Sequence, residues 1–266
     1  MSHRIIVMWS IPRSVSTSFE RMVSERGDHR VFDEPFSRSY YYGPDRLSTR
    51  YGEEMPGCTA EQVLADIEEA ARDRPVFVKD MAYQAARLLG PDLLCRFDNC
   101  FLVRDPAATL RSLARTWPDF TDDETGWRHL DEAARITDSL GQPRVVVDAD
   151  ILCRDPAPVV EEWCARMDLP YDAEALTWEP GMRPEWELWG DWHGSTARSS
   201  GFGALREPPP PPTPDEPRLF AAYQQAVPVY RRLVAEAIGA PSSERRSVPG
   251  SSSAGHDGPV ATDGSS

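Results

Sequence analysis

Short, strongly apolar runs alternate with segments of helical periodicity along most of the chain. The apolar runs cover residues 4–9 (RIIVMW), 76–78 (VFV), 100–103 (CFLV) and 145–147 (VVV). Apolar residues recur at helical spacing in the segments that follow them, which are residues 16–26, 81–89, 106–116 and 156–167. Such runs are typical of parallel strands buried on both faces. The alternation predicts an α/β fold, a doubly wound parallel sheet flanked by helices with right-handed crossovers.

The remaining segments extend this plan. Residues 60–71 and 124–140 have the pattern of amphipathic helices on the faces of the sheet, and residues 31–36 (VFDEPF) predict a further strand that ends in two carboxylates and a proline. After Leu169 the pattern becomes irregular and rich in tryptophan, which indicates a long ordered cover. A helical period resumes over residues 215–237, where Pro228 is expected to kink or divide the helix.

Length and composition favour one domain. The chain has 266 residues, 40% of them hydrophobic, which is enough for a core of this kind. We expect a single domain over residues 1–240, with a proline-rich connector at 207–217. Serine, glycine and proline dominate residues 241–266, so we expect a disordered tail there.

The charge narrows the classes of partner. A net charge of −14 opposes general affinity for nucleic acid or anionic membranes. No apolar run approaches the roughly 20 residues that cross a bilayer, and the first ten residues lack the features of a signal peptide. We therefore expect a soluble, cytoplasmic protein. The five cysteines lack metal-ligand spacing, so no metal site is expected, and the sequence does not indicate an oligomeric state.

Residues 9–21 (WSIPRSVSTSFER) follow the first predicted strand and open the first predicted helix. Unpaired backbone N–H groups and the helix dipole favour an anion at this position. The glycines and the lysine of a Walker A loop are absent, which disfavours an ordinary ATPase or GTPase. Arg13 supplies a fixed charge instead, and hydroxyl groups surround it on Ser14, Ser16, Thr17 and Ser18. The segment is thus a candidate phosphate-binding loop, although a capped helix with a stray arginine would have the same residues.

A second segment, residues 101–112 (FLVRDPAATLRS), has a related layout. Arg104 follows a buried strand, an Asp-Pro pair turns the chain, and Ser112 lies about two helical turns further on. An arginine at a strand tip and a serine on the next helix can bind one phosphate from two sides.

Together the two segments resemble the sulfotransferases that use 3′-phosphoadenosine 5′-phosphosulfate (PAPS). Residues 12–17 match the PxxxST motif of that family, and Arg104, Pro106 and Ser112 match its RxPxxxxxS-like motif. The resemblance covers residues 5–171 and, more loosely, extends to residue 237. It implies a P-loop-containing sulfotransferase-like fold, nearest to the bacterial and carbohydrate branches, which tolerate arginine where Arg13 replaces a lysine.

The resemblance also implies roles for particular residues. The loop from Arg13 to Ser18 would hold the 5′-phosphosulfate, and Arg104 with Ser112 would hold the 3′-phosphate. A loop over the nucleotide is expected at residues 195–203, with candidate contacts at Arg198, Ser199 and Gly201. After sulfuryl transfer the product would be adenosine 3′,5′-bisphosphate (PAP).

Sulfuryl transfer to a hydroxyl or amine of a small molecule also needs a base, because the acceptor loses a proton during the in-line displacement. Glu34 matches the position of the usual base in the branches that this chain resembles, and Asp33 and His193 are rivals for the role. Lys79, the only lysine of the chain, would reach the sulfuryl oxygens or the leaving phosphate, or it is simply an exposed charge. The tryptophans after Leu169 would shape an apolar acceptor pocket or pack beneath a lid.

Three other classes of protein stay open. A non-catalytic protein on the same fold would bind the nucleotide, or a partner, without turnover. A P-loop small-molecule kinase is disfavoured by the missing Walker residues. Pyridoxal phosphate chemistry would require Lys79 as its Schiff base.

Overall fold

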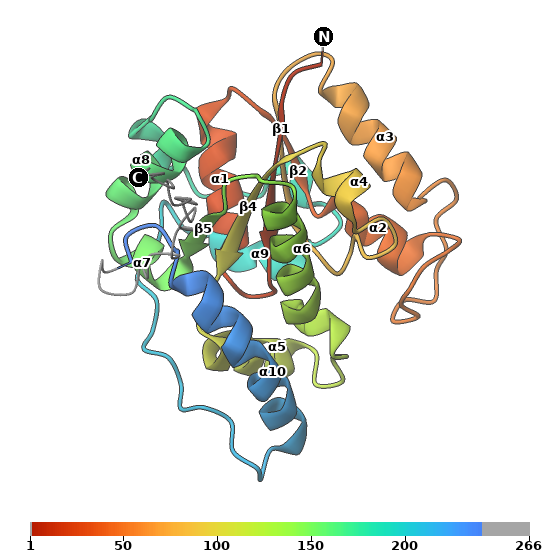
Figure 1. Ribbon diagram of the computed structural model, residues 1–266, viewed down its shortest axis with the longest axis vertical. Helices are drawn as coiled ribbons and strands as arrows, with labels where there is room; N and C mark the ends of the chain where they lie inside the picture. The colour runs from red at the N-terminus through yellow and green to blue at the C-terminus, as the bar shows by residue number, and fades with distance from the viewer. Residues whose placement is uncertain (1, 241–266) are drawn as a thin grey trace, which may run out of the picture.

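The structure, a computed structural model, describes residues 2–240 and is built on a five-stranded, all-parallel sheet (Figure 1). The strand order is β2-β3-β1-β4-β5. The strands are β1 (Ile5–Ser10), β2 (Arg30–Asp33), β3 (Val76–Met81), β4 (Asp98–Val103) and β5 (Val145–Asp148). The predicted parallel α/β fold is confirmed, and every residue of β1 and β3 is buried, as the apolar runs require.

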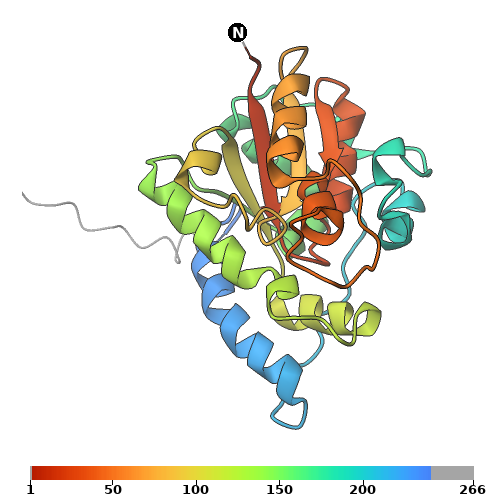
Figure 2. The same cartoon turned by 90° about the vertical axis from the view of Figure 1, so that its right-hand side faces the viewer.

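Helices cover both faces of the sheet. Successive side chains of a strand point to opposite faces, and β1 shows this directly. Val7 and Trp9 pack in one core with α3 (Ala60–Ala70), α5 (Pro106–Thr116), α6 (Trp127–Ser139) and α10 (Pro217–Val234). Ile6 and Met8 pack in the other core with α1 (Ser16–Arg26), α7 (Ala149–Arg154) and α8 (Pro156–Arg166). Figures 1 and 2 show these two helical layers with the sheet between them.

The second strand and its continuation differ from the prediction. β2 ends at Asp33, and Glu34 turns the chain at a φ of 45° into α2 (Pro35–Tyr42), which begins with the proline. A proline is favoured in a first helical turn because its missing N–H is not needed there. Residues 82–88 form successive turns rather than the predicted helix, and α4 (Pro91–Leu94) follows. These turns direct Tyr83 and Gln84 into hydrogen bonds with Tyr41 and Glu34.

The chain after Leu169 contains the predicted irregular stretch and the predicted last helix, but both differ from the prediction in detail. The irregular cover contains short 3₁₀ turns at Glu174–Leu176 and Pro184–Trp186 and a helix, α9 (Gly190–Ala197), which carries His193, and a further 3₁₀ turn at Asp123–Thr125 precedes α6. The connector at 207–217 runs without regular structure to α10. α10 continues through Pro228, because burial of Ala222, Ala226 and Leu233 against the core compensates for the missing backbone hydrogen bond.

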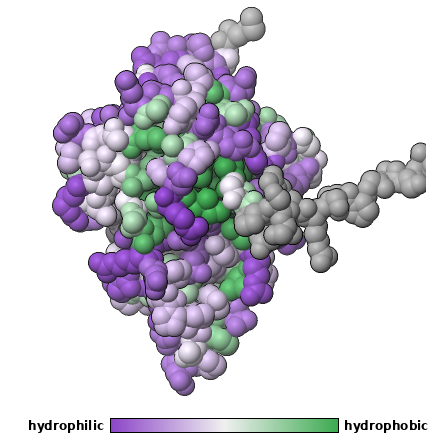
Figure 3. All heavy atoms as spheres, turned by 90° about the vertical axis from the view of Figure 1, so that its left-hand side faces the viewer, coloured by the Kyte–Doolittle hydropathy of each residue, from purple (hydrophilic) through white to green (hydrophobic). Residues whose placement is uncertain are grey.

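The surface is mainly polar on the face shown in Figure 3, where hydrophilic side chains form the rim and apolar atoms gather towards the middle. No helix in residues 2–240 is long and apolar enough to cross a membrane. The expected disordered tail at 241–266 lies outside the described residues, and the single domain over 1–240 stays a prediction.

Candidate active site

The two motif segments meet at the carboxyl ends of β1 and β4, which are neighbouring strands. Arg13 donates a hydrogen bond from Nε to Ser112 Oγ at 3.1 Å. Arg104 donates from Nη1 to the backbone oxygen of Arg13 at 3.0 Å. All three residues line one cleft, whose empty volume, open solvent included, is about 940 Å³. Carboxyl ends of parallel strands are the usual place for a ligand in such a sheet.

The loop before α1 has a backbone suited to an anion. Arg13 and Val15 adopt left-handed conformations, with φ of 66° and 70°, although neither is glycine. Such alternation turns successive N–H groups towards one point, and it costs strain that is typical of functional sites. α1 starts directly afterwards at Ser16 and has no acidic residue in its first turn. The amino end of α1 therefore faces the cleft with its positive dipole uncompensated.

The hydroxyl groups of this loop are not equivalent. Ser14 is buried and donates to the backbone oxygen of Ile11 at 2.7 Å, so it stabilises the turn. Ser18 is also buried, and its Oγ lies 3.1 Å from Thr196 Oγ1 on α9. Ser16 and Thr17 both line the cleft as well.

Positive charge is concentrated at this end of the cleft. Burial, reinforced by the charges of Arg104 and Arg115, lowers the pKa of Arg13. The Arg13 guanidinium also lies 5.5 Å from the centre of the Trp192 ring. Arg104 has a buried Nε with no hydrogen-bond partner among the described residues. A buried, unpaired donor costs free energy, so an anion that accepted from it would be stabilised.

Glu34 lines the cleft beside the loop and is held at both carboxylate oxygens. Its Oε1 accepts from Lys79 Nζ at 2.8 Å, and its Oε2 accepts from Gln84 Nε2 at 3.0 Å. The side chain is nearly buried, and the residue takes a left-handed backbone conformation. The carboxylate is thus fixed in orientation at the wall of the cleft.

Lys79 does not reach the cleft, in contrast to the sequence-based expectation. It is fully buried on β3, and its Nζ contacts Glu34, Asp33 and, at 3.5 Å, Glu20 Oε2. Burial would lower the pKa of Lys79, but the charges of Asp33 and Glu34 outweigh it and raise that pKa well above its usual value. Lys79 therefore positions the Glu34 carboxylate from the protein interior, without lining the cleft itself.

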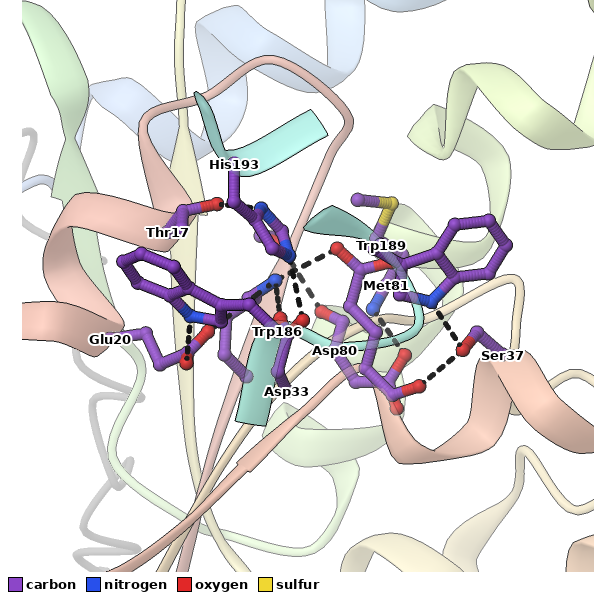
Figure 4. A network of polar contacts seen from close by, with 12 residues as sticks. Thr17, Glu20, Asp33, Ser37, Asp80, Met81, Trp186, Trp189 and His193 are labelled. Atoms are coloured by element: carbon purple, nitrogen blue, oxygen red, sulfur yellow. Dashed lines mark hydrogen bonds and ion pairs between the residues drawn. The ribbon is translucent and has the colours of Figure 1, made fainter. Parts of the chain in front are cut away.

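A buried polar network extends from Lys79 to the loop. Figure 4 shows its members Asp33, His193 and Thr17. His193 Nε2 lies 2.7 Å from Asp33 Oδ2, and His193 Nδ1 lies 3.0 Å from Thr17 Oγ1. Burial would raise the pKa of Asp33, but the charge of Lys79 and the hydrogen bond from His193 hold it below its usual value. Asp33 faces this network and does not line the cleft.

Glu20, on α1, is a further buried member of the network. Burial and the neighbouring charge of Asp33 raise its pKa well above the usual value, and it accepts a hydrogen bond from Trp186 Nε1 at 2.8 Å. Consider pH values between the pKa of Glu20 in the unfolded chain and its raised pKa in the folded protein. In this range unfolding releases a proton from Glu20, so the free energy of unfolding of the wild type falls as pH rises.

We predict that Glu20→Gln, which can still accept from Trp186, removes this loss. Its melting temperature should exceed that of the wild type by on the order of 3 °C or more at pH 8, and the two should converge below about pH 4.5. Thermal unfolding followed by circular dichroism across this pH range is the measurement. A constant difference at every pH would contradict the raised pKa.

Aromatic side chains also line the cleft. They come from four separate places in the chain and are Tyr41, Tyr83, Trp117, Trp189 and Trp192. Tyr41 and Tyr83 share a hydrogen bond at 3.0 Å, and the Trp117 and Trp192 rings pack edge to face at 4.6 Å. Of the four tryptophans after Leu169, two therefore line the cleft, whereas Trp178 and Trp186 pack in the interior.

The loop predicted to cover the nucleotide lines the cleft only at its start, through Ser195 and Thr196, and its three candidate contacts do not line the cleft. Arg198 is exposed, and Gly201 forms an isolated bridge with Thr177. Ser199 accepts from Trp178 Nε1 at 3.2 Å and donates to the backbone oxygen of Thr196. These contacts tie the segment to neighbouring loops.

Several site residues were missed from the sequence. Tyr41, Tyr83 and Gln84 line the cleft, and Glu20 belongs to the network. One usable signal was the YYY run at 40–42, shortly after the two carboxylates at 33 and 34, and another was a glutamate beside Phe19 on the apolar face of α1.

A model of the sulfotransferase domain family matches residues 4–237, so the chain belongs to the sulfotransferase domain family. The family resemblance indicated by the two motifs is thereby confirmed. Two Arabidopsis thaliana proteins, named branched-chain-amino-acid aminotransferase-like protein 2 and protein 1, are each 30% identical to this chain, over 212 and 213 residues. Those alignments cover 77% of this chain but only 37% and 38% of the plant proteins, so the chain spans little more than a third of their length.

Two solved structures are similar in fold. The sulfotransferase domain of the Synechococcus PCC 7002 olefin synthase has a TM-score of 0.49 at 17% identity and covers 84% of this chain and 95% of its own. The sulfotransferase domain of the curacin biosynthetic pathway has a TM-score of 0.44 at 15% identity and covers 76% of this chain and 84% of its own.

Proposed function

We propose that this protein transfers a sulfuryl group from PAPS to a hydroxyl or amine of a small-molecule acceptor. The observation that carries the proposal is the meeting of Arg13, Arg104 and Ser112 at one end of a single cleft. Two fixed cations beside a helix amino terminus suit a ligand with several negative charges. Membership of the sulfotransferase domain family supports PAPS as that ligand.

The residues present fit such a donor. In the proposal, the N–H groups of the loop, the Arg13 side chain and the hydroxyls of Ser16 and Thr17 hold the 5′-phosphosulfate. Arg104 and Ser112 hold the 3′-phosphate, which would give the unpaired Nε of Arg104 a partner. An anion between the arginines would also offset the burial and the neighbouring positive charges that lower the pKa of Arg13. Ser14 and Ser18 act by shaping the loop. Arg198, Ser199 and Gly201 are assigned no contact with the donor.

Glu34 is the proposed base. Its carboxylate lines the same cleft as Arg13 and the aromatic side chains, so an acceptor bound there would meet the sulfuryl group beside it. Lys79 and Gln84 fix its orientation, so it can accept the acceptor proton without rearranging. Charge builds on the leaving phosphate during transfer, and Arg13 stabilises it.

The aminotransferase in the names of the plant relatives points to a different chemistry, which depends on a lysine as Schiff base. The only lysine of this chain is Lys79, and it lies behind Glu34 with its ammonium held by carboxylates. This arrangement favours a supporting role for Lys79 over a Schiff base.

The experiment is incubation of the protein with PAPS and a panel of neutral hydroxyl and amine compounds, with PAP and sulfated products measured by mass spectrometry. The proposal predicts sulfated product in amounts equal to the PAP released. Tight binding of PAP with no product from a broad panel would favour a non-catalytic nucleotide-binding protein. Phosphorylated product from ATP and Mg²⁺ would favour a kinase.

A further inference from the structure

His193 occupies an unusual place between the donor loop and the buried network. It lies on α9, is only 2% exposed, and its ring lies 5.3 Å from that of Trp186 (Figure 4). One ring nitrogen faces Asp33, and the other faces the hydroxyl of Thr17. The contact between Ser18 and Thr196 ties the same two helices together a turn further on.

The positions of the hydrogen atoms in the contacts from Asp33 through His193 to Thr17 follow from the charge of Asp33. An ionised carboxylate only accepts hydrogen bonds, so His193 Nε2 carries a hydrogen and donates it to Asp33. In the neutral ring, Nδ1 then has a lone pair and accepts the hydroxyl hydrogen of Thr17. In the protonated ring, Nδ1 donates to Thr17 Oγ1 instead, and the hydroxyl hydrogen of Thr17 is free to point into the cleft.

We propose that His193 is a positioning residue that takes up one proton when the anionic donor binds, so that the Thr17 hydroxyl turns to donate to the phosphosulfate. This inference rests on the proposed function. The proton comes from solvent, resides on Nδ1 while the nucleotide is bound, and returns to solvent when PAP leaves. Thr17 is the last residue of the PxxxST segment, so the ring controls a direct contact with the donor.

The charges around His193 are compatible with such a change. Asp33 faces it from β2, Glu20 lies on α1 beside Trp186, and Lys79 on β3 contacts both carboxyl groups. Glu34 and Arg13 line the same cleft, Asp191 on α9 is exposed, and so is Arg198 directly after α9. Asp33 favours the imidazolium, whereas Lys79 and Arg13 oppose it. A ligand with several negative charges beside Thr17 shifts this balance towards the protonated ring.

Proton uptake can be counted by titrating the protein with PAP in a calorimeter at pH 8, in buffers that differ in ionisation enthalpy. At this pH the phosphates of PAP are ionised, because their second pKa is about 6. The slope of observed enthalpy against buffer enthalpy gives the protons taken up. We expect about one proton for the wild type and about none for His193→Gln. Correspondingly, the affinity of the wild type for PAP should fall by up to about tenfold per pH unit above neutrality, whereas the affinity of His193→Gln for PAP should not change with pH.

Two further variants sharpen the test. His193→Asn places an amide near the position of Nδ1, so it should retain most of the affinity for PAP without taking up a proton. His129→Gln removes another buried histidine, on α6 and away from the cleft, and should take up the same proton as the wild type. Binding of PAP with no uptake by the wild type, or undiminished uptake by His193→Gln and His193→Asn, would overturn the inference and leave the proposed function intact. No heat from PAP with any variant would overturn both.

Discussion

Replacement of Lys79 by Met destabilises the fold by about 3–5 kcal/mol, because it leaves buried carboxylates without their counter-charge. Lys79 is fully buried and contacts Asp33, Glu34 and Glu20. A methionine fills much of the same volume, so the loss reflects charge more than packing. Urea denaturation, with the midpoint and slope fitted together, is the measurement.

The matched control is Arg96→Met, which removes an exposed ion pair with Glu68. The expected change for that variant is below about 1 kcal/mol, because exposed pairs are screened by solvent. Equal midpoints for Lys79→Met and Arg96→Met would show that the buried network does not hold the site together.

Replacement of Glu34 by Gln is expected to lower kcat by about 10²–10⁴-fold while leaving the affinity for PAP within about twofold. The amide keeps the size of the side chain and an acceptor for Lys79, but it cannot take the proton of the acceptor substrate. Steady-state sulfuryl transfer and calorimetric binding of PAP together give the two numbers. Glu61→Gln, at an exposed position on α3, is the control and should change neither.

Full turnover by Glu34→Gln would remove Glu34 as the base. A large loss of kcat in His193→Gln with unchanged affinity for PAP would then move the role to His193. The two variants therefore separate a catalytic base from a residue that positions the donor loop.

The backbone of the donor site could be predicted from the sequence because its signals are local. β1, α1 and α5 begin and end within about a residue of the prediction, since apolar runs, a proline in the first turn and helical periodicity mark them. The sequence did not predict the strand order, which places β1 beside β4 and so brings Arg13 and Ser112 to the same edge of the sheet.

The acceptor side could not be predicted in the same way. Residues 82–88 have a helical pattern, yet hydrogen bonds from Tyr83 and Gln84 to α2 and Glu34 hold them in turns. These partners lie about 40 or more residues away in sequence, so no local pattern records them. His193 lies in the segment expected to be irregular, and its burial on α9 depends on Asp33 and Thr17, which lie 160 and 176 residues away in sequence.

The burial of Lys79 illustrates the same limit. A lone lysine at a strand end is commonly exposed, and only the convergence of Glu20, Asp33 and Glu34 makes its burial stable. That convergence joins α1, β2 and β3, and it exists only after the sheet has formed.

Calorimetric titration of the wild type and Arg104→Ala with adenosine 3′,5′-bisphosphate and adenosine 5′-monophosphate shows whether one cleft binds an adenosine nucleotide through phosphates at both ends. The wild type should prefer the bisphosphate by about 10–100-fold, since charge-assisted hydrogen bonds contribute about 1.5–3 kcal/mol, and Arg104→Ala should lose this preference. Equal affinity of the wild type for the two nucleotides, or an undiminished preference in Arg104→Ala, would contradict binding through both phosphates.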